Sequence, residues 1–126
     1  MAETKFYEFR QNNTGGWFDF DEKVCLVMFI EAINKKHAIA IAEELGCYFD
    51  GVYDGKDCGC CGDRWYEPDE DDVVDIGKYG SVEEYAQRTA NNSYEWTTPS
   101  CRIFYLDGKV VEIFKKEDKL NEQQVK

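Results

Sequence analysis

The sequence predicts one α+β domain in which an antiparallel sheet, built from two β-hairpins, is covered by two helices. Runs rich in aromatic and β-branched residues, which favour strands, occur near both ends of the chain, at 5–32 and 101–114. Two amphipathic stretches lie between them, and Asp107-Gly108 in the second run is a strong hairpin signal. A length of 126 residues suits one domain, which we place at 1–114, followed by a polar tail at 115–126.

The first hairpin is expected within residues 5–32. The aromatic run KFYEFR at 5–10 is a candidate strand, and QNNTGG at 11–16 is typical of a turn, since amide side chains bond nearby backbone and glycine adopts positive φ. Residues 17–32 then resume as strand. Between Val24 and Ile30 both alternating faces are apolar, which indicates a central strand covered on both sides.

The two helices are defined by their ends and by their apolar faces. Asn34 is expected to cap the first helix and Gly46 to end it in a left-handed conformation. Its apolar stripe is formed by Ala38, Ile41, Ala42 and Leu45. Ser81 and Glu84 form a capping box at the start of the second helix. The stripe of that helix is formed by Val82, Tyr85, Ala86, Thr89 and Ala90.

The chain between these helices has weaker signals. CYFDGVYDG at 47–55 is expected to form a short strand or a series of turns. EPDEDDVVD at 67–75 holds six carboxylates and no basic residue, so we expect an exposed loop there. Arg64 and the adjacent Asp63 are expected to pair locally.

Composition excludes several classes of function. The chain has 26 acidic and 15 basic residues and a formal net charge of −11, which repels the phosphates of nucleic acids, so direct nucleic-acid binding is not expected. The N-terminus lacks a basic segment followed by an apolar run, and no stretch is apolar enough to span a bilayer. We therefore expect a cytoplasmic protein whose six cysteines are reduced or bind metal.

The most specific motif is the cysteine loop DCGCCGDRW at 57–65. Cys58 and Cys61 form the C-x-x-C-G pattern of a zinc knuckle, with Cys60 between them. A structural zinc site needs four ligands, and Cys47 is the best candidate to complete this one. The other candidate ligands are Cys25, Cys101, His37, Asp57 and Asp63. Two alternatives remain: reduced thiols packed in a glycine-rich turn, and a thioredoxin-like redox pair, although the βαβ context of that pair is missing.

Two places are candidates for a small anionic ligand such as a nucleotide. The backbone amides of the 11–16 loop could cradle a phosphate; its candidate residues are Asn12, Asn13, Gly15 and Gly16. Lys35 and Lys36 lie in the first turn of the first helix, where the helix dipole disfavours cations but attracts anions. The alternatives are a plain hairpin loop and two solvated lysines.

An acidic run beside aromatic residues is a candidate surface for a partner protein. The carboxylates could imitate nucleic-acid phosphates toward a basic protein, or form a solvated loop, since they lack the ligand spacing of an EF-hand. The candidate partner-binding residues are Trp65, Tyr66, Asp69, Glu70, Asp71 and Asp72. Trp17, Trp65 and Trp96 are most often core residues, and any that is exposed would be an interface anchor.

Signals of catalysis are weak. There is one histidine, His37, without an evident nucleophile beside it, and neither a Ser-His-Asp pattern nor H-E-x-x-H is present. We therefore expect a protein that is not an enzyme.

Four segments, YEFRQNNTGG, ELGCYFDGV, DCGCCGDRW and LDGKVVEI, resemble a family of small, acidic, uncharacterised proteins encoded mainly by bacteriophages. The signature DCxCCGDRW is the most specific part of this resemblance, which extends to about Phe114. It implies a phage setting and no catalytic residues. With the charge and the aromatic content, it leads us to expect a stoichiometric inhibitor or modulator of a host or defence protein with a basic surface; the alternatives are a nucleotide-binding or nucleotide-sequestering module and a small zinc-stabilised protein of another role.

Overall fold

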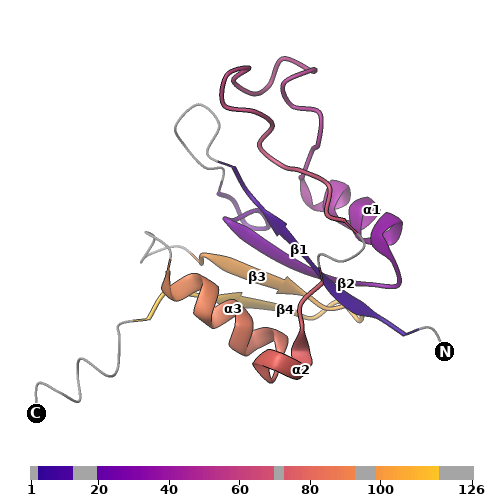
Figure 1. Ribbon diagram of the computed structural model, residues 1–126, viewed down its shortest axis with the longest axis vertical. Coiled ribbons are helices and arrows are strands. Elements are labelled where there is room, and N and C mark those ends of the chain that lie inside the picture. Colours follow the sequence, from indigo (N-terminus) through magenta and orange to yellow (C-terminus); the bar gives the residue numbers. More distant parts are fainter. Residues whose placement is uncertain (1–2, 13–19, 70–72, 93–98, 117–126) are drawn as a thin grey trace, which may run out of the picture.

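The fold is known from a computed structural model, which describes residues 3–12, 20–69, 73–92 and 99–116. Figure 1 shows a four-stranded sheet with helices on its two sides. Its strands, in spatial order, are β1 (Lys5–Arg10), β2 (Val27–Ala32), β3 (Cys101–Phe104) and β4 (Val110–Ile113). The helices are α1 (Lys35–Leu45), the short α2 (Ile76–Tyr79) and α3 (Val82–Asn91). The predicted α+β class is therefore confirmed.

The sheet is mixed, so the prediction of a wholly antiparallel sheet is wrong at its centre. β1 pairs antiparallel with β2, and β3 pairs antiparallel with β4, as the two predicted hairpins require. β2 and β3 run parallel, with Val27 opposite Cys101. The reason is the long connection between them, which contains all three described helices and returns the chain to the same end of the sheet.

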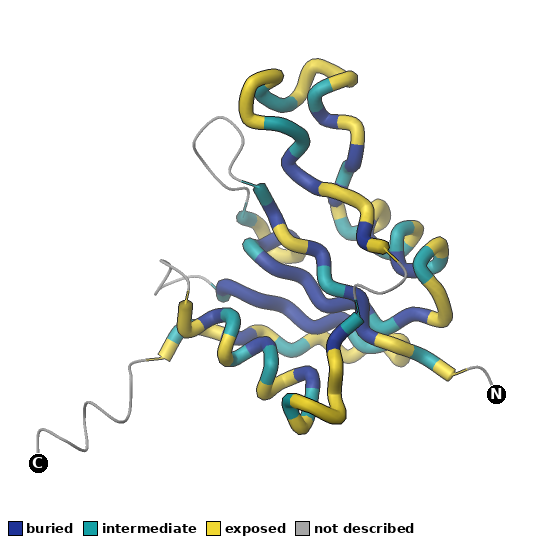
Figure 2. The backbone as a smooth tube through the Cα atoms, in the orientation of Figure 1, coloured by how far each residue is buried: buried dark blue, intermediate teal, exposed yellow. Residues whose placement is uncertain are grey.

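Each face of the sheet packs against one helix. On one face, Met28 and Ile30 of β2 join Ala38 and Ala42 of α1 in a buried cluster. On the other face, Val27, Phe29 and Ile103 pack with three buried residues of α3. Those three residues are Val82, Ala86 and Ala90. The two central strands, β2 and β3, are accordingly the most buried part of the chain in Figure 2, and the prediction that β2 is covered on both sides is confirmed.

The predicted helix ends are also confirmed. The side chain of Asn34 accepts a hydrogen bond from the backbone N–H of His37 at 2.8 Å. Gly46 follows α1 in the left-handed region with φ 117°. The hydroxyl of Ser81 accepts from the N–H of Glu84 at 3.1 Å at the start of α3.

Residues 47–55 form turns, which was one of the two predicted alternatives. Two other segments differ from the prediction. Residues 20–26, which were expected to belong to the second strand, form bends and irregular structure, so β2 begins only at Val27. The acidic segment 67–75 is not wholly exposed: Pro68 and Val74 are buried, and Val73 forms an isolated bridge with Tyr7 of β1. The two valines hold this end of the loop against the sheet because they bury apolar surface there. At the opposite edge of the sheet, the Asp107-Gly108 turn joins β3 to β4 as predicted, with Gly108 at φ 100°.

No helix in the described ranges is long and apolar enough to cross a membrane.

Candidate functional site: a cysteine-bearing excursion

Residues 47–69, which we call the excursion, project from the body of the protein beyond the end of α1 (Figure 1). This segment contains neither a strand nor a helix, and its outer part is largely exposed (Figure 2). Its base is anchored in the core by Cys47, Phe49 and Trp65. Long irregular loops in compact domains are uncommon and are usually functional when they are ordered, so the contacts that order this one indicate what it holds in place.

A buried ion pair holds the two halves of the excursion together. The guanidinium of Arg64 lies 3.8 Å from the Asp57 carboxylate, and both side chains are excluded from solvent. The Asp57 carboxylate also accepts hydrogen bonds from the Arg64 backbone N–H at 2.8 Å and from the Tyr48 hydroxyl at 3.1 Å. Residue 51 must be glycine here, because a Cβ at this position would overlap the same carboxylate. The predicted pairing of Arg64 with Asp63 is wrong, since the Asp63 carboxylate instead accepts from the backbone N–H of Val52 at 2.8 Å.

Asn12 joins the excursion to the sheet. Its side-chain amide donates to the carbonyl oxygens of Cys61 at 2.9 Å and Asp63 at 3.1 Å. Its backbone N–H donates to the carbonyl of Arg64 at 2.7 Å. The side chain of Arg64 in turn donates to Gln11 at 3.2 Å. A residue that sequence reasoning assigned to phosphate binding therefore fixes the position of the cysteine turn.

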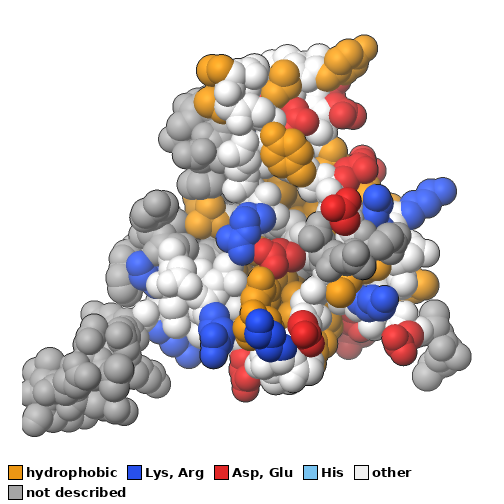
Figure 3. Space-filling view, in the orientation of Figure 1, with side chains coloured by type: hydrophobic (Ala, Val, Ile, Leu, Met, Phe, Trp, Pro, Cys, Tyr) orange, Lys and Arg blue, Asp and Glu red, His pale blue; other side chains and the backbone are white. Residues whose placement is uncertain are grey.

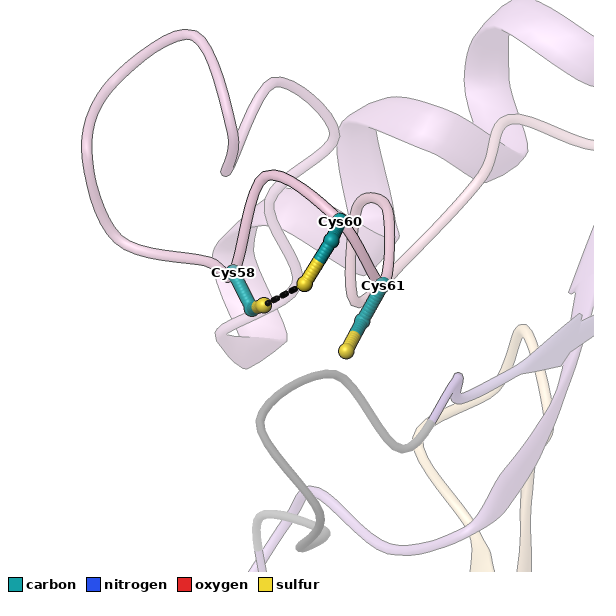
Figure 4. A group of neighbouring side chains, drawn as sticks. All are labelled: Cys58, Cys60 and Cys61. Carbon is teal, nitrogen blue, oxygen red and sulfur yellow. Dashed lines mark hydrogen bonds between the residues drawn. The ribbon is translucent and has the colours of Figure 1, made fainter.

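Three thiols converge in that turn. The sulfur atoms of Cys58, Cys60 and Cys61 all lie within 4.8 Å of one another. Figure 4 shows the Cys58 and Cys60 side chains pointing toward each other, with their sulfurs 3.1 Å apart. The turn is closed by the N–H groups of Cys61 and Gly62, which donate to the Cys58 carbonyl at 3.2 and 3.0 Å. Positive φ at Gly62 lets the chain leave the turn without strain.

The cluster favours a thiolate at neutral pH. Hydrogen bonds from the Cys60 and Cys61 thiols, and then from their backbone amides, lower the pKa of Cys58 to about 7. Hydrogen bonding to Cys58 raises the pKa of Cys60, so the first proton leaves from Cys58. A thiolate is the form of cysteine that binds metal and reacts with electrophiles. The three thiols could hold a metal ion, and they are accessible from solvent.

The predicted fourth ligand is not part of this cluster. Cys47 is buried under α1, where its thiol contacts the sulfur of Met28 at 3.7 Å. The other two cysteines, Cys25 and Cys101, are buried as well. Burial raises the pKa of Cys25 and of Cys47 to about 12, which keeps them as thiols. The six cysteines thus divide into three core residues and three clustered thiols that could hold a metal ion, and the assignment of Cys47 to the metal site is wrong.

The predicted partner-binding residues have different environments. Trp65 is completely buried, so it cannot anchor a partner, and that part of the prediction is wrong. Tyr66 is 55% exposed, Asp69 is exposed, and residues 70–72 lie outside the described ranges. Tyr53, which sequence reasoning did not select, is 91% exposed on the excursion. The signal that could have identified it is an aromatic residue between two aspartates in the turn-forming sequence DGVYDG.

The predicted nucleotide-binding residues do not come together. Asn12 follows the end of β1 that lies opposite Val27, whereas Lys35 and Lys36 follow the opposite end of β2. A strand of this length separates the two places by roughly 20 Å. Residues 13–19, which include Asn13, Gly15, Gly16 and Trp17, lie outside the described ranges, as does Trp96.

These features define a small α+β protein with a solvent-accessible thiol cluster on an ordered excursion. The chain belongs to a family described as a domain of unknown function, DUF7296, whose family model matches residues 4–121. No curated protein and no solved structure matches the chain.

Proposed function

We propose that the protein is a non-catalytic binding protein whose excursion docks against a basic surface of a partner protein. The observation that carries this proposal is the 91% exposure of Tyr53 on a loop that is otherwise held in one shape. Tyrosine is enriched where protein surfaces meet, because it buries a large area and still offers a hydroxyl. A tyrosine held out into solvent by an ordered loop is available for such a contact.

The rigidity of the excursion supports a binding role. Its shape is set by the buried Arg64–Asp57 pair and by the bonds from Asn12, and not by packing of its outer residues. A loop that is ordered before association loses less conformational entropy when a partner binds. The buried Arg64–Asp57 pair and the Asn12 hydrogen bonds therefore also affect the surface of the protein, since they hold Tyr53 and Tyr66 in a fixed arrangement.

The charge of the excursion favours a basic partner. Its exposed carboxylates outnumber its one exposed basic residue, Lys56; they are Asp50, Asp54, Glu67 and Asp69. Figure 3 shows acidic side chains beside hydrophobic ones over this part of the surface. Opposite charge accelerates the encounter of two proteins and selects the partner. The resemblance to bacteriophage-encoded proteins favours a host or defence protein as this partner, and carboxylates in such an arrangement can imitate nucleic-acid phosphates.

Quantitative capture from a host lysate tests this proposal. The immobilised chain is expected to retain a defined basic protein, with affinity that falls as ionic strength rises. We expect Tyr53→Ser to weaken binding about tenfold or more, which corresponds to about 1.4 kcal/mol. Leu106→Ser, which removes an exposed apolar side chain from the β3–β4 turn, is the matched control and should leave binding unchanged.

Binding that is indifferent to salt and to Tyr53→Ser would show that the excursion is not the docking surface. Turnover of a substrate by the purified chain would refute the non-catalytic role itself.

We further propose that the metal held by the thiol cluster is zinc. Zinc favours thiolate ligands at about 2.3 Å, and three sulfurs within 4.8 Å of one another can converge on one ion after a small opening of the Cys58–Cys60 contact. Three protein ligands leave the fourth zinc position for water or for a group of the partner. Such an ion would also link the three cysteines of the 58–62 turn and so stabilise the outer part of the excursion.

Elemental analysis combined with alkylation tests the zinc proposal. We expect one zinc per chain, and we expect zinc to protect Cys58, Cys60 and Cys61 from iodoacetamide near neutral pH, as mapped by mass spectrometry. Cys60→Ser should lower the zinc content, whereas the control Cys47→Ala should not, because Cys47 lies in the core. Equal alkylation with and without zinc would exclude the site.

A further inference from the structure

A second candidate site lies on the face of the sheet that α3 covers, and none of the three clustered cysteines lines it. Helix α3 packs mainly on β3 and β4, so the end of β1 is left open beside it. A pocket of about 390 Å³ fills this space. Its floor includes the apolar side chains of Leu26 and Val27, and its walls come from Arg10 on one side and from α2 and α3 on the other. Clefts that bind small molecules begin at about this size.

The charge of this pocket is opposite to that of the chain. Among the described residues, Arg10 and Arg88 line it and no carboxylate does, although the chain has 26 acidic residues. Glu8, which lies outside the pocket, holds the Nε and Nη2 atoms of Arg10 at 3.1 and 2.6 Å. In the described part of the chain, Arg88 has no carboxylate partner and lies over the ring of Tyr79 at 5.6 Å. Figure 3 shows basic side chains over α3 on this face.

The same pocket presents aromatic rings. The rings of Tyr79 and Tyr85 lie 4.7 Å apart at its wall. The Tyr85 hydroxyl donates to Glu8 at 2.9 Å, so a single carboxylate orients both Tyr85 and Arg10. Arginine and aromatic side chains side by side are suited to a ligand that carries both a negative charge and a flat ring.

A simpler role accounts for one of these residues. Arg88 lies in the last turn of α3, where a positive charge complements the helix dipole. Arg10, on the opposite wall, is paired with Glu8, so Arg88 is the arginine that the helix dipole and the ion pairs of the described residues leave without a carboxylate. Neither role accounts for the absence of carboxylates from the described lining. The two arginines and the two tyrosines converge only in the folded protein.

We propose that this pocket binds a nucleoside monophosphate, with the phosphate at the arginines and the base against the tyrosine wall and the apolar floor. This site differs from the one that the sequence suggested, because it uses neither Lys35 nor Lys36. Gln11 of the lining accepts a hydrogen bond from Arg64 of the excursion, but the proposed contacts use neither Tyr53 nor the clustered thiols, so the test does not depend on the proposed partner.

Titration of the ¹⁵N-labelled chain, followed by NMR, tests this proposal. We expect AMP and CMP to shift the amide resonances of Arg10, Tyr85 and Arg88 saturably, with dissociation constants of about 1 mM or lower. Inorganic phosphate and adenosine, which each carry half of the recognised chemistry, should bind at least about tenfold more weakly.

Two variants distinguish binding of AMP in this pocket from non-specific attraction of an anion to positive charge. Arg88→Gln should weaken AMP binding at least about tenfold, while circular dichroism stays unchanged and the thermal midpoint falls by no more than about 5 °C through the lost interaction with the helix dipole. Lys36→Gln removes the same charge from α1 on the other face and should have no effect. The proposal is overturned if AMP causes no saturable shift, if phosphate alone binds as tightly as AMP, or if the two variants bind AMP equally well.

Discussion

At the scale of single residues, the Arg64–Asp57 pair has the largest effect on the candidate site. Both side chains are buried, and every hydrogen bond described for the Asp57 carboxylate comes from within the excursion. A buried charge is tolerated only when its partner is present, since desolvation of an unpaired ion is costly. The pair therefore couples the stability of the protein to the shape of the loop.

Replacement of Arg64 by leucine tests this coupling. We expect Arg64→Leu to lower the free energy of unfolding by about 3–5 kcal/mol, because it leaves the Asp57 charge buried and unpaired. The double variant with Asp57→Asn should recover part of the loss, because the charge is then absent. Urea unfolding measures both values, and exposed Lys56→Gln is the control, expected within about 0.5 kcal/mol of the parent. A double variant as unstable as Arg64→Leu would contradict the role of the charge.

The cysteine turn shows which residue-scale features a sequence can reveal. The C-x-x-C-G spacing predicted that Cys58, Cys60 and Cys61 share one turn, because the outcome depends on five consecutive residues. The partner of Arg64 could not be found in this way. Asp63 is adjacent in sequence, but the folded loop brings back Asp57, seven positions away, to meet the guanidinium.

At the scale of elements, helix ends were predicted correctly because capping is local. Asn34 and Ser81 each bond to a backbone N–H three residues further on, so their roles need no tertiary structure. Gly46 depends partly on tertiary structure. Glycine is favoured there by the local backbone, with φ at 117°, and also by the close approach of a neighbouring residue. A Cβ at this position would lie 3.2 Å from a methyl group of Val24.

A comparison of two glycines separates these contributions. We expect Gly46→Ala to lower the free energy of unfolding by about 1–2 kcal/mol, since left-handed backbone is unfavourable for alanine and the added methyl group crowds Val24. Gly55→Ala is the matched control: its φ is also positive, at 78°, but nothing lies within 4 Å of the added atom. Urea unfolding should show the smaller loss for Gly55→Ala. Equal losses would mean that the contact with Val24 relaxes freely.

At the scale of the whole molecule, three buried thiols contribute to the response to alkaline pH, as do Tyr85 and Tyr105, whose pKa values are raised by burial and by their hydrogen bonds to Glu8 and Glu83. Burial raises the pKa of Cys25 and Cys47 from 9.0 to about 12, and it also raises the pKa of Cys101. A folded-state pKa above the unfolded value means that the stabilising contribution is complete below pH 9 and is lost as pH rises toward 12. The pH dependence that Cys58 contributes has the opposite sign. Its pKa is lowered in the folded state, so its stabilising contribution is present above pH 9 and is lost as pH falls to about 7.

The buried groups are expected to dominate, since Cys58 is near the surface. We predict that the free energy of unfolding falls between pH 9 and pH 11, by on the order of 1 kcal/mol per buried thiol per pH unit. Urea unfolding at several pH values measures this slope, and Cys25→Ala should reduce it by one thiol's contribution. A stability that stays constant over this range would show that the core thiols ionise without cost.

The topology of the sheet could not be predicted from the same local signals. Alternating and doubly apolar runs indicated where strands lie, and Asp107-Gly108 fixed the β3–β4 hairpin. The direction of β3 relative to β2 depends on how 68 intervening residues, 33–100, travel across the sheet, which no short motif specifies. The parallel central pair was missed for this reason.

The sequence alone determined what depends on neighbouring residues: the helix caps, the second hairpin, the central position of β2 and the thiol turn. Tertiary structure decided everything that depends on residues far apart in the chain. It buried Trp65 and Cys47, exposed Tyr53, paired Arg64 with Asp57, and brought Arg10 of a strand and Arg88 of a helix to the lining of one pocket. Local hydrogen bonds and turn conformations depend on a few adjacent side chains. The burial of a residue, and the meeting of residues that are distant in sequence, depend on the path of the whole chain.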